Sequence, residues 1–243
     1  MGVNEAIIKL REMLRDSKNI VFFGGAGVST ESGIPDFRSA EGLFSEQAPH
    51  VAPEEILSHD FFMAHPEAFF DFYRRKMVYP AARPNAAHTR LAQWERAGKL
   101  SAVITQNIDG LHGMAGSETV LELHGSIHRN SCMSCKKKFG LCAIMEAEGV
   151  PRCSCGGIIK PDVVLYQEQL SSACLAAAID ALRRADMLIV AGTSMNVYPA
   201  AGLVQHYGAD RLVLVNMTDS MRGMGDYLFV QGKVGEVLGS LLS

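Results

Sequence analysis

The sequence predicts an α/β fold in which a doubly wound parallel sheet is interrupted by a small inserted module. Short apolar runs along the chain have the length and composition of buried strands. Helical patterns separate several of these runs, and strands that alternate with helices form parallel sheets. Two closely spaced cysteine pairs lie in a stretch that breaks the alternation, which indicates the insertion.

The chain is expected to open with an amphipathic helix behind Asn4, a candidate N-cap. Apolar residues at helical spacing in it are Val3, Ile7, Leu10 and Leu14. Expected strands are residues 19–23, 100–105, 187–191, 211–215 and 227–230, and expected helices are 85–97, 171–185 and 199–207. Ligands of a parallel sheet gather at the carboxyl ends of its strands, so chemistry is expected in the loops that follow these runs.

Length and composition restrict the class of protein. The 243 residues, 48% hydrophobic and 20% charged, fit one sizeable globular domain or one domain with a small insertion. The formal net charge of −3 gives no global basic field to collect nucleic acid or anionic lipid. No apolar run approaches the roughly 20 residues of a membrane span, and residues 1–20 lack the apolar core of a signal peptide. We therefore expect a cytoplasmic protein without direct nucleic-acid or membrane partners.

The first expected strand ends in a glycine-rich loop, Gly24-Gly-Ala-Gly27-Val-Ser29. Glycines let a phosphate approach the backbone, and a following helix N-terminus would offer free N–H groups to negative charge. The dehydrogenase fingerprint G-x-G-x-x-G fails, because Thr30 stands where its third glycine belongs. The loop predicts a nucleotide site and argues against an ordinary hydride-transfer enzyme. A glycine-rich turn without a ligand is the alternative.

Polar side chains also follow other expected strands. They are Gln106, Asn107 and Asp109 after 100–105, His124 before Gly125, Thr193 and Ser194 after 187–191, and Asn216 after 211–215. Asn and Asp groups can match the donors and acceptor of a carboxamide ligand, and hydroxyls suit ribose or phosphate oxygens. Any one of these loops could be an Asx-turn, but several at one edge of a sheet indicate a shared ligand. His88, His112 and His128 are expected to be structural.

The cysteine module at residues 126–161 holds Cys132-x-x-Cys135 and Cys153-x-Cys155, close to the spacing of a zinc site. Four thiolates form a closed tetrahedral site for one structural zinc, with no open position for catalysis. The second pair is one residue shorter than usual, which leaves Cys142 as a possible substitute ligand. A reduced cysteine cluster without metal is the alternative.

The ordered set of motifs resembles the sirtuin family, of bacterial type. Matching stretches are residues 25–29, 33–38, 84–88, 105–112, 124–125, 160–164 and 192–194, together with the cysteine pairs. They run in the family's order from about residue 20 to 216. The resemblance implies a Rossmann-like NAD-binding domain at 1–40, 84–125 and 162–243, with a helical flap at 41–83 and a zinc-binding module at 126–161.

The resemblance further implies an NAD-dependent protein deacetylase or deacylase. Such an enzyme transfers the acyl group of acyl-lysine proteins or peptides to ADP-ribose and releases nicotinamide and O-acyl-ADP-ribose. His124, Asn107 and Asp109 would be catalytic. His124 would accept a proton from a ribose hydroxyl, a task that suits imidazole because its unperturbed pKa is about 6.5.

By position, the implied NAD site comprises Gly25, Ala26, Gly27, Thr30, Asp36, Phe37, Arg38, Gln106, Asn107, Ile108, Asp109, His124, Thr193, Ser194, Asn216 and Val234. Val163 and Val197 resemble positions at which a substrate peptide adds as a strand. Sirtuins that remove acidic acyl groups carry Tyr-x-x-Arg where this chain has Tyr73 and Lys76. A lysine lacks the bidentate fork of arginine, so neutral acyl groups are favoured.

Two other functions stay open at this point. The same NAD site could serve a protein mono-ADP-ribosyltransferase. Alternatively, a zinc-ribbon protein could sense NAD or bind nucleic acid, which the run Lys136-Lys-Lys138 beside the first cysteine pair would favour.

Overall fold

The computed structural model describes residues 2–36 and 52–241, and its largest element is a six-stranded parallel sheet. The strands lie in the order β3-β2-β1-β7-β8-β9, and all neighbours pair in parallel. Their bounds are β1 Ile20–Gly24, β2 Leu100–Thr105, β3 Val120–Glu122, β7 Met187–Ala191, β8 Leu212–Asn216 and β9 Leu228–Gln231. The five predicted strands are confirmed, each within one residue of its expected bounds.

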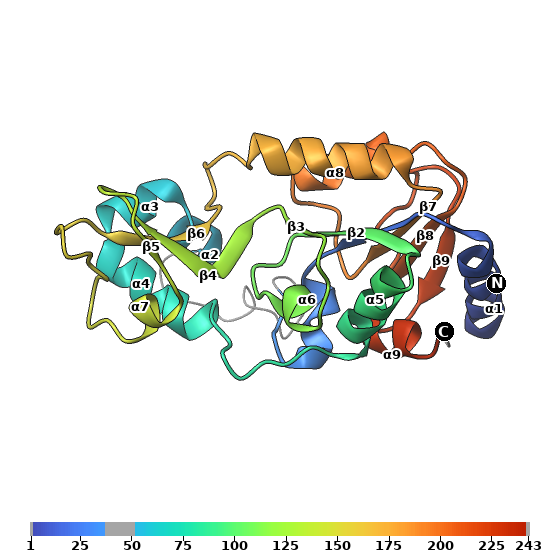
Figure 1. Ribbon diagram of the computed structural model, residues 1–243, viewed down its shortest axis with the longest axis horizontal. Helices are drawn as coiled ribbons and strands as arrows, with labels where there is room; N and C mark the ends of the chain where they lie inside the picture. The colour runs from blue at the N-terminus through green and yellow to red at the C-terminus, as the bar shows by residue number, and fades with distance from the viewer. Residues whose placement is uncertain (1, 37–51, 242–243) are drawn as a thin grey trace.

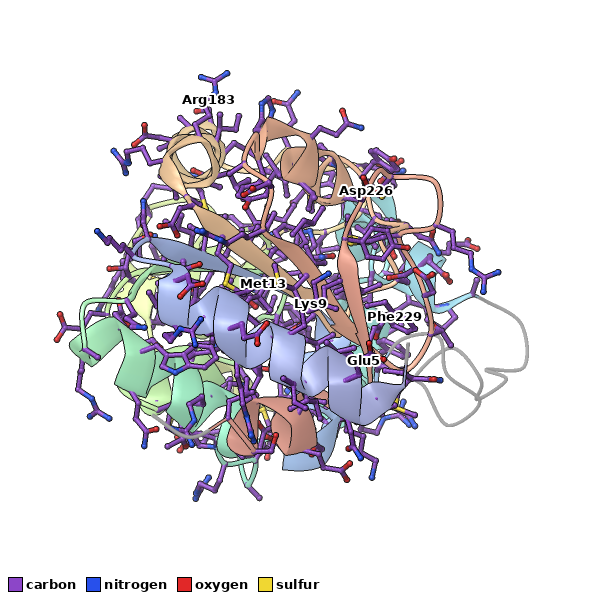
Figure 2. The ribbon with its side chains drawn as sticks, turned by 90° about the vertical axis from the view of Figure 1, so that its right-hand side faces the viewer. Glu5, Lys9, Met13, Arg183, Asp226 and Phe229 are labelled. Carbon is purple, nitrogen blue, oxygen red and sulfur yellow. The ribbon has the colours of Figure 1, made fainter. Side chains whose placement is uncertain are left out.

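Helices cover both faces of this sheet (Figure 1). One face carries α1 (Val3–Asp16), α5 (Ala86–Arg96) and α9 (Val234–Gly239), and the other carries α8 (Ser172–Arg184) and the 3-10 helix η3 (Ala200–His206). Phe22 belongs to one core and Phe23 to the other, because successive side chains of a strand point to opposite faces. In Figure 2, α1 lies in the foreground, with Glu5 and Lys9 exposed. The doubly wound α/β prediction is confirmed.

Two local expectations near the start of the chain are wrong. α1 begins directly after Gly2, so Asn4 lies inside its first turn and is not the N-cap. The glycine loop contains one 3-10 turn, η1 (Ala26–Val28), and a second, η2 (Thr30–Ser32), follows it where an α-helix N-terminus was expected. Gly33, at φ 80°, ends η2 in the left-handed conformation and so prevents its continuation.

A smaller unit lies beside the large sheet (Figure 1). Its antiparallel sheet has the order β5-β4-β6, and helices α2, α3, α4 and α7 cover it. The bounds are β4 Gly125–Cys132, β5 Lys138–Phe139, β6 Ile159–Val163, α2 Pro53–Ile56, α3 His59–Ala64, α4 Pro66–Lys76 and α7 Cys142–Met145. Phe62, Phe69 and Phe70 of the helical segment share one apolar core with Ile127 and Ile159 of the cysteine module. The two stretches that break the α/β alternation therefore pack as one unit.

Within the part of the chain that the structure describes, no helix has the length and apolar character needed to cross a membrane.

Candidate functional site

The glycine loop after β1 packs directly against the loop after β7. The N–H of Gly25 donates to the carbonyl of Ala191 at 3.1 Å, and that of Gly27 donates to the carbonyl of Gly192 at 2.8 Å. A Cβ on Gly27 would lie 2.7 Å from the Cα of Gly192. A Cβ on Gly192, whose φ is 58°, would lie 2.5 Å from the backbone nitrogen of Val28. The close contact between these two backbones therefore requires both glycines. This requirement holds whether or not a phosphate also approaches the loop.

Three polar side chains converge where β1 and β2 end. The Ser29 hydroxyl donates to Oδ2 of Asp109 at 2.7 Å, and Nδ2 of Asn107 donates to the Ser29 oxygen at 3.1 Å. Oδ1 of Asp109 accepts the N–H of Leu111 at 2.9 Å, at the start of α6 (Leu111–Met114). Ser29 is 1% exposed and Asn107 is 9% exposed, so these polar contacts are shielded from water. The expected pair Asn107 and Asp109 is thus brought together by a serine.

A second polar network joins the loops after β2, β7 and β8. Nε2 of Gln106 donates to the Thr193 hydroxyl at 3.1 Å. The Thr193 carbonyl accepts from Nδ2 of Asn216 at 3.0 Å and from the Ser220 hydroxyl at 2.9 Å. Three strand ends that are distant in sequence therefore form one polar surface, as the sheet topology predicts.

His124 lies in the link between β3 of the large sheet and β4 of the smaller unit, directly before Gly125. Its Nδ1 is 2.9 Å from the carbonyl of Gln106, a contact that fits an Nδ1–H donor and leaves Nε2 as an acceptor. Burial lowers the pKa of His124 below 6.5, and the bond to the Gln106 carbonyl offsets this only in part. The ring is therefore neutral at pH 7, with a lone pair able to accept a proton.

The backbone around His124 is fixed by close contact with β6. The carbonyl of His124 accepts the N–H of Val164 at 2.9 Å. Gly125 has φ 78°, and a Cβ there would collide with the carbonyl oxygen of Asp162. A side chain at this position would thus push β6 away from the histidine.

Two buried histidines lie behind the Asp109 cluster, with ring centroids 4.7 Å apart. Burial lowers the pKa of His88 to about 4 and that of His112 to about 3, so both rings are neutral at pH 7. Asn85 lies 3.0 Å from Nδ1 of His88 and donates to a carbonyl of the glycine loop at 2.8 Å. Both histidines are therefore structural residues that pack behind the site. His128 is exposed, with Nε2 3.1 Å from the carbonyl of Asp109.

The other expected cofactor residues differ in their exposure to solvent. Ala26, Asp36 and Ile108 are half-buried, whereas Thr30 and Ser194 are exposed. The side chain of Val234 is 2% exposed and packs in the core under the sheet, so only its backbone could face a ligand. Phe37 and Arg38 lie outside the described residues.

The two expected peptide-contact residues lie on separate elements of the chain. Val163 ends β6, opposite Gly125 of β4, and is 7% exposed. Val197 is half-buried in the loop between β7 and η3, and its carbonyl accepts the N–H of Ala201 at 2.9 Å.

The four cysteines of the module form a compact thiol cluster. The sulfurs of Cys132, Cys135, Cys153 and Cys155 all lie within 4.8 Å of one another. Tetrahedral zinc with Zn–S bonds of about 2.3 Å needs sulfurs roughly 3.8 Å apart, which this cluster matches. The backbone N–H of Cys135 lowers the pKa of Cys132 to about 6, which favours the thiolate that a metal requires. The short second pair therefore does not prevent a four-cysteine site, and Cys142 is not part of the cluster.

Comparison with known proteins agrees with this geometry. The family model described as "Sir2 family" matches residues 25–199. The chain belongs to the Sir2 family. An "NAD-dependent protein deacetylase" of Clostridium perfringens is 52% identical to this Sir2 protein, over 99% of this chain and 100% of its own length. A protein of the same description from Staphylococcus aureus is 38% identical over 96% of this chain and 97% of its own.

Solved Sir2 structures share the whole architecture. One, described as "Structural Basis for the Mechanism and Regulation of Sir2 Enzymes", has a TM-score of 0.87 at 40% identity and covers 98% of this chain and 96% of its own. Another, described as "Sir2-p53 peptide-NAD+", has a TM-score of 0.82 at 36% identity, with the same coverage.

Two residues of the polar networks, Ser29 and Ser220, were not among the expected site residues of this Sir2 protein. Ser29 ends the glycine-loop motif, and that position was the only signal available. Ser220 lies in a loop of ordinary turn composition, so nothing in the sequence distinguishes it.

Proposed function

We propose that this Sir2 protein is an NAD-dependent lysine deacylase that acts on proteins or peptides. One observation carries the proposal: His124, neutral and oriented by the Gln106 carbonyl, adjoins loops from four strand ends that present amide, carboxylate and hydroxyl groups. When bound, NAD would supply a ribose carbon from which nicotinamide leaves and a ribose hydroxyl oxygen that receives the acyl group.

Three residues of this chain have different roles around the reacting ribose. His124 accepts a proton from a ribose hydroxyl through Nε2, because Nδ1 is engaged with Gln106. Asp109 places negative charge beside the position where positive charge develops on the ribose, and Ser29 fixes the orientation of its carboxylate. Asn107 offers its amide oxygen to the carboxamide of nicotinamide, since its amide nitrogen is held by Ser29.

The other expected site residues bind rather than react. The network of Gln106, Thr193 and Asn216 suits ribose hydroxyls and phosphate oxygens of the dinucleotide. Val163 and Val197 flank the position of an acyl-lysine peptide that adds as a strand. Zinc held by the four cysteines closes the smaller unit and takes no part in the reaction, because four thiolates leave no open coordination position.

Neutral acyl groups are the substrates we propose. Tyr73 is fully buried, and burial raises the pKa of its hydroxyl, so it does not ionise at neutral pH. Lys76 brings one positive charge to this region but cannot form the paired hydrogen bonds that arginine gives a carboxylate. Acidic acyl groups carry a carboxylate that would need these paired hydrogen bonds, so they are expected to be poor substrates.

The lysine run beside the zinc site argues against the nucleic-acid alternative. Nζ of Lys138 lies 3.0 Å from Asp162, and Nζ of Lys136 donates to the carbonyl of Met133 at 2.9 Å. Lys137 lies over the ring of Phe139. With each lysine engaged by its own module and a net charge of −3, we propose no nucleic-acid partner. A cytoplasmic location belongs to the same proposal, since six cysteines without a disulfide are typical of a reducing compartment.

Product analysis tests the proposal. The protein is incubated with NAD and a peptide carrying acetyl-lysine or succinyl-lysine, and all products are identified by mass spectrometry. We expect free lysine, nicotinamide and O-acetyl-ADP-ribose from the acetyl peptide, with much slower turnover of the succinyl peptide. Consumption of NAD with ADP-ribose attached to protein and acetyl-lysine intact would overturn the proposal in favour of ADP-ribosyl transfer.

A further inference from the structure

The segment from Val163 to Glu168 connects the zinc-bearing unit to the large sheet, running from β6 toward α8 (Figure 1). Its backbone forms hydrogen bonds with two other parts of the chain. The N–H of Val164 donates to the carbonyl of His124 at 2.9 Å. Two residues later, the N–H of Tyr166 donates to Leu57 at 3.0 Å, and the Tyr166 carbonyl accepts the N–H of His59 at 3.0 Å. The segment therefore bridges the His124 loop and the helical segment.

A half-buried ion pair lies under this segment. Nζ of Lys160 and Oε2 of Glu168 are 3.0 Å apart, and their side chains are 17% and 23% exposed. The same ammonium donates to the carbonyl of Val163 at 3.0 Å, and the same carboxylate oxygen accepts the N–H of Leu165 at 2.9 Å. The other oxygen of Glu168 lies 3.0 Å from Nδ1 of His59. The pair thus holds one backbone group on each side of Val164.

The carboxylate of Glu168 is charged at neutral pH despite its surroundings. Burial acts to raise its pKa, but the Leu165 N–H, His59 and Lys160 together outweigh burial, so the pKa lies below its usual value. Charged hydrogen bonds of this kind are stronger than neutral ones and fix geometry more tightly. The carboxylate and ammonium therefore hold the Val163 carbonyl and the Leu165 N–H in fixed directions.

We propose that Glu168 and Lys160 are positioning residues for the acyl-lysine peptide. This inference rests on the proposed deacylase function, in which a peptide adds as a strand beside Val163. Strand addition relies on main-chain hydrogen bonds, and its affinity is higher when the receiving strand is already ordered. The ion pair orders the backbone on both sides of Val164. The N–H of Val164 in turn donates to the His124 carbonyl.

Neither residue touches the strand-end loops of the NAD site in the described contacts, so the two substrates should respond differently. Loss of the pair should raise the KM for peptide about tenfold, which corresponds to about 1.4 kcal/mol and is typical of a hydrogen bond to a charged group. The KM for NAD, measured at saturating peptide, should change less than twofold. A role confined to stability would lower active protein and leave both KM values unchanged.

The test uses Glu168→Gln, Lys160→Met and the double variant, with steady-state kinetics in both substrates and a melting temperature for each protein. Glu168→Gln keeps the shape of the side chain and removes its charge, so it is the variant expected to fold best. Glu95→Gln is the matched control. Its carboxylate accepts two backbone N–H groups, at 2.9 Å and 2.7 Å, but it lies on helix α5, far from β6 in sequence.

We expect the peptide KM to rise in both single variants, the double variant to add little to either one, and Glu95→Gln to keep wild-type KM values. An unchanged peptide KM in Glu168→Gln, or an equal rise in the KM for NAD, would overturn the inference. Wild-type protein that fails to deacylate any peptide would instead refute the proposed function, so the two failures are distinguishable.

Discussion

Replacing Gly125 with alanine should lower the free energy of unfolding by about 3 kcal/mol. The left-handed conformation at φ 78° costs a residue with a Cβ about 1–2 kcal/mol. The added methyl also meets the Asp162 carbonyl, a backbone atom that cannot rotate away, and such overpacking costs about 1–3 kcal/mol more. Relief requires movement of β6, which binds the His124 carbonyl through Val164. Deacylation should therefore fall together with stability.

Urea unfolding followed by circular dichroism measures the loss, and Gly98→Ala serves as the control. Gly98 has φ 71°, close to that of Gly125, but nothing lies within 4 Å of an added Cβ. It should lose only the conformational part, about 1–2 kcal/mol. Equal losses in the two variants would refute the reasoning, because the contact with Asp162 would then contribute nothing.

Other consequences concern protonation, metal and the aromatic core. Because burial lowers the pKa of His124 below 6.5, kcat/KM should fall on the acid side as the base is protonated, with a midpoint below pH 6.5; a midpoint above pH 6.5 would contradict this. Elemental analysis should find about one zinc per chain, lost in Cys135→Ser with a lower melting temperature and retained in Cys142→Ser; equal zinc in both variants would exclude the proposed ligand set. Among the described residues the Tyr73 hydroxyl is buried and has no hydrogen-bond partner, so Tyr73→Phe should raise the free energy of unfolding by up to about 1 kcal/mol. A loss of more than about 1 kcal/mol on urea unfolding would reveal a partner for that hydroxyl.

Much of the large sheet could be predicted because strands buried on both faces are continuous apolar runs, as in residues 187–191. The order of strands then explains why Gln106, Thr193 and Asn216 meet, since parallel strands end at one edge. Local signals were less reliable. Asn4 has the chemistry of an N-cap, but the helix begins two residues earlier, because Gly2 already adopts the extended conformation of a cap.

Contacts between distant segments could not be predicted from local patterns. Phe62 and Phe69 indicate buried helices, but nothing in their spacing shows that they pack against the zinc-bearing sheet. Ser29 is one of many serines, and its role depends on Asp109 arriving from another strand. The ion pair of Lys160 and Glu168 likewise exists only because the chain turns back after β6.

The central claim is that His124 is the base of an NAD-dependent deacylation, and its most direct test is the rate of peptide deacylation by His124→Ala. General bases contribute roughly 10²- to 10⁴-fold, so we predict at least a hundredfold loss with an unchanged melting temperature. His206→Ala, which removes an exposed histidine at the end of η3, should keep the wild-type rate. Deacylation by folded His124→Ala at the wild-type rate would contradict the account.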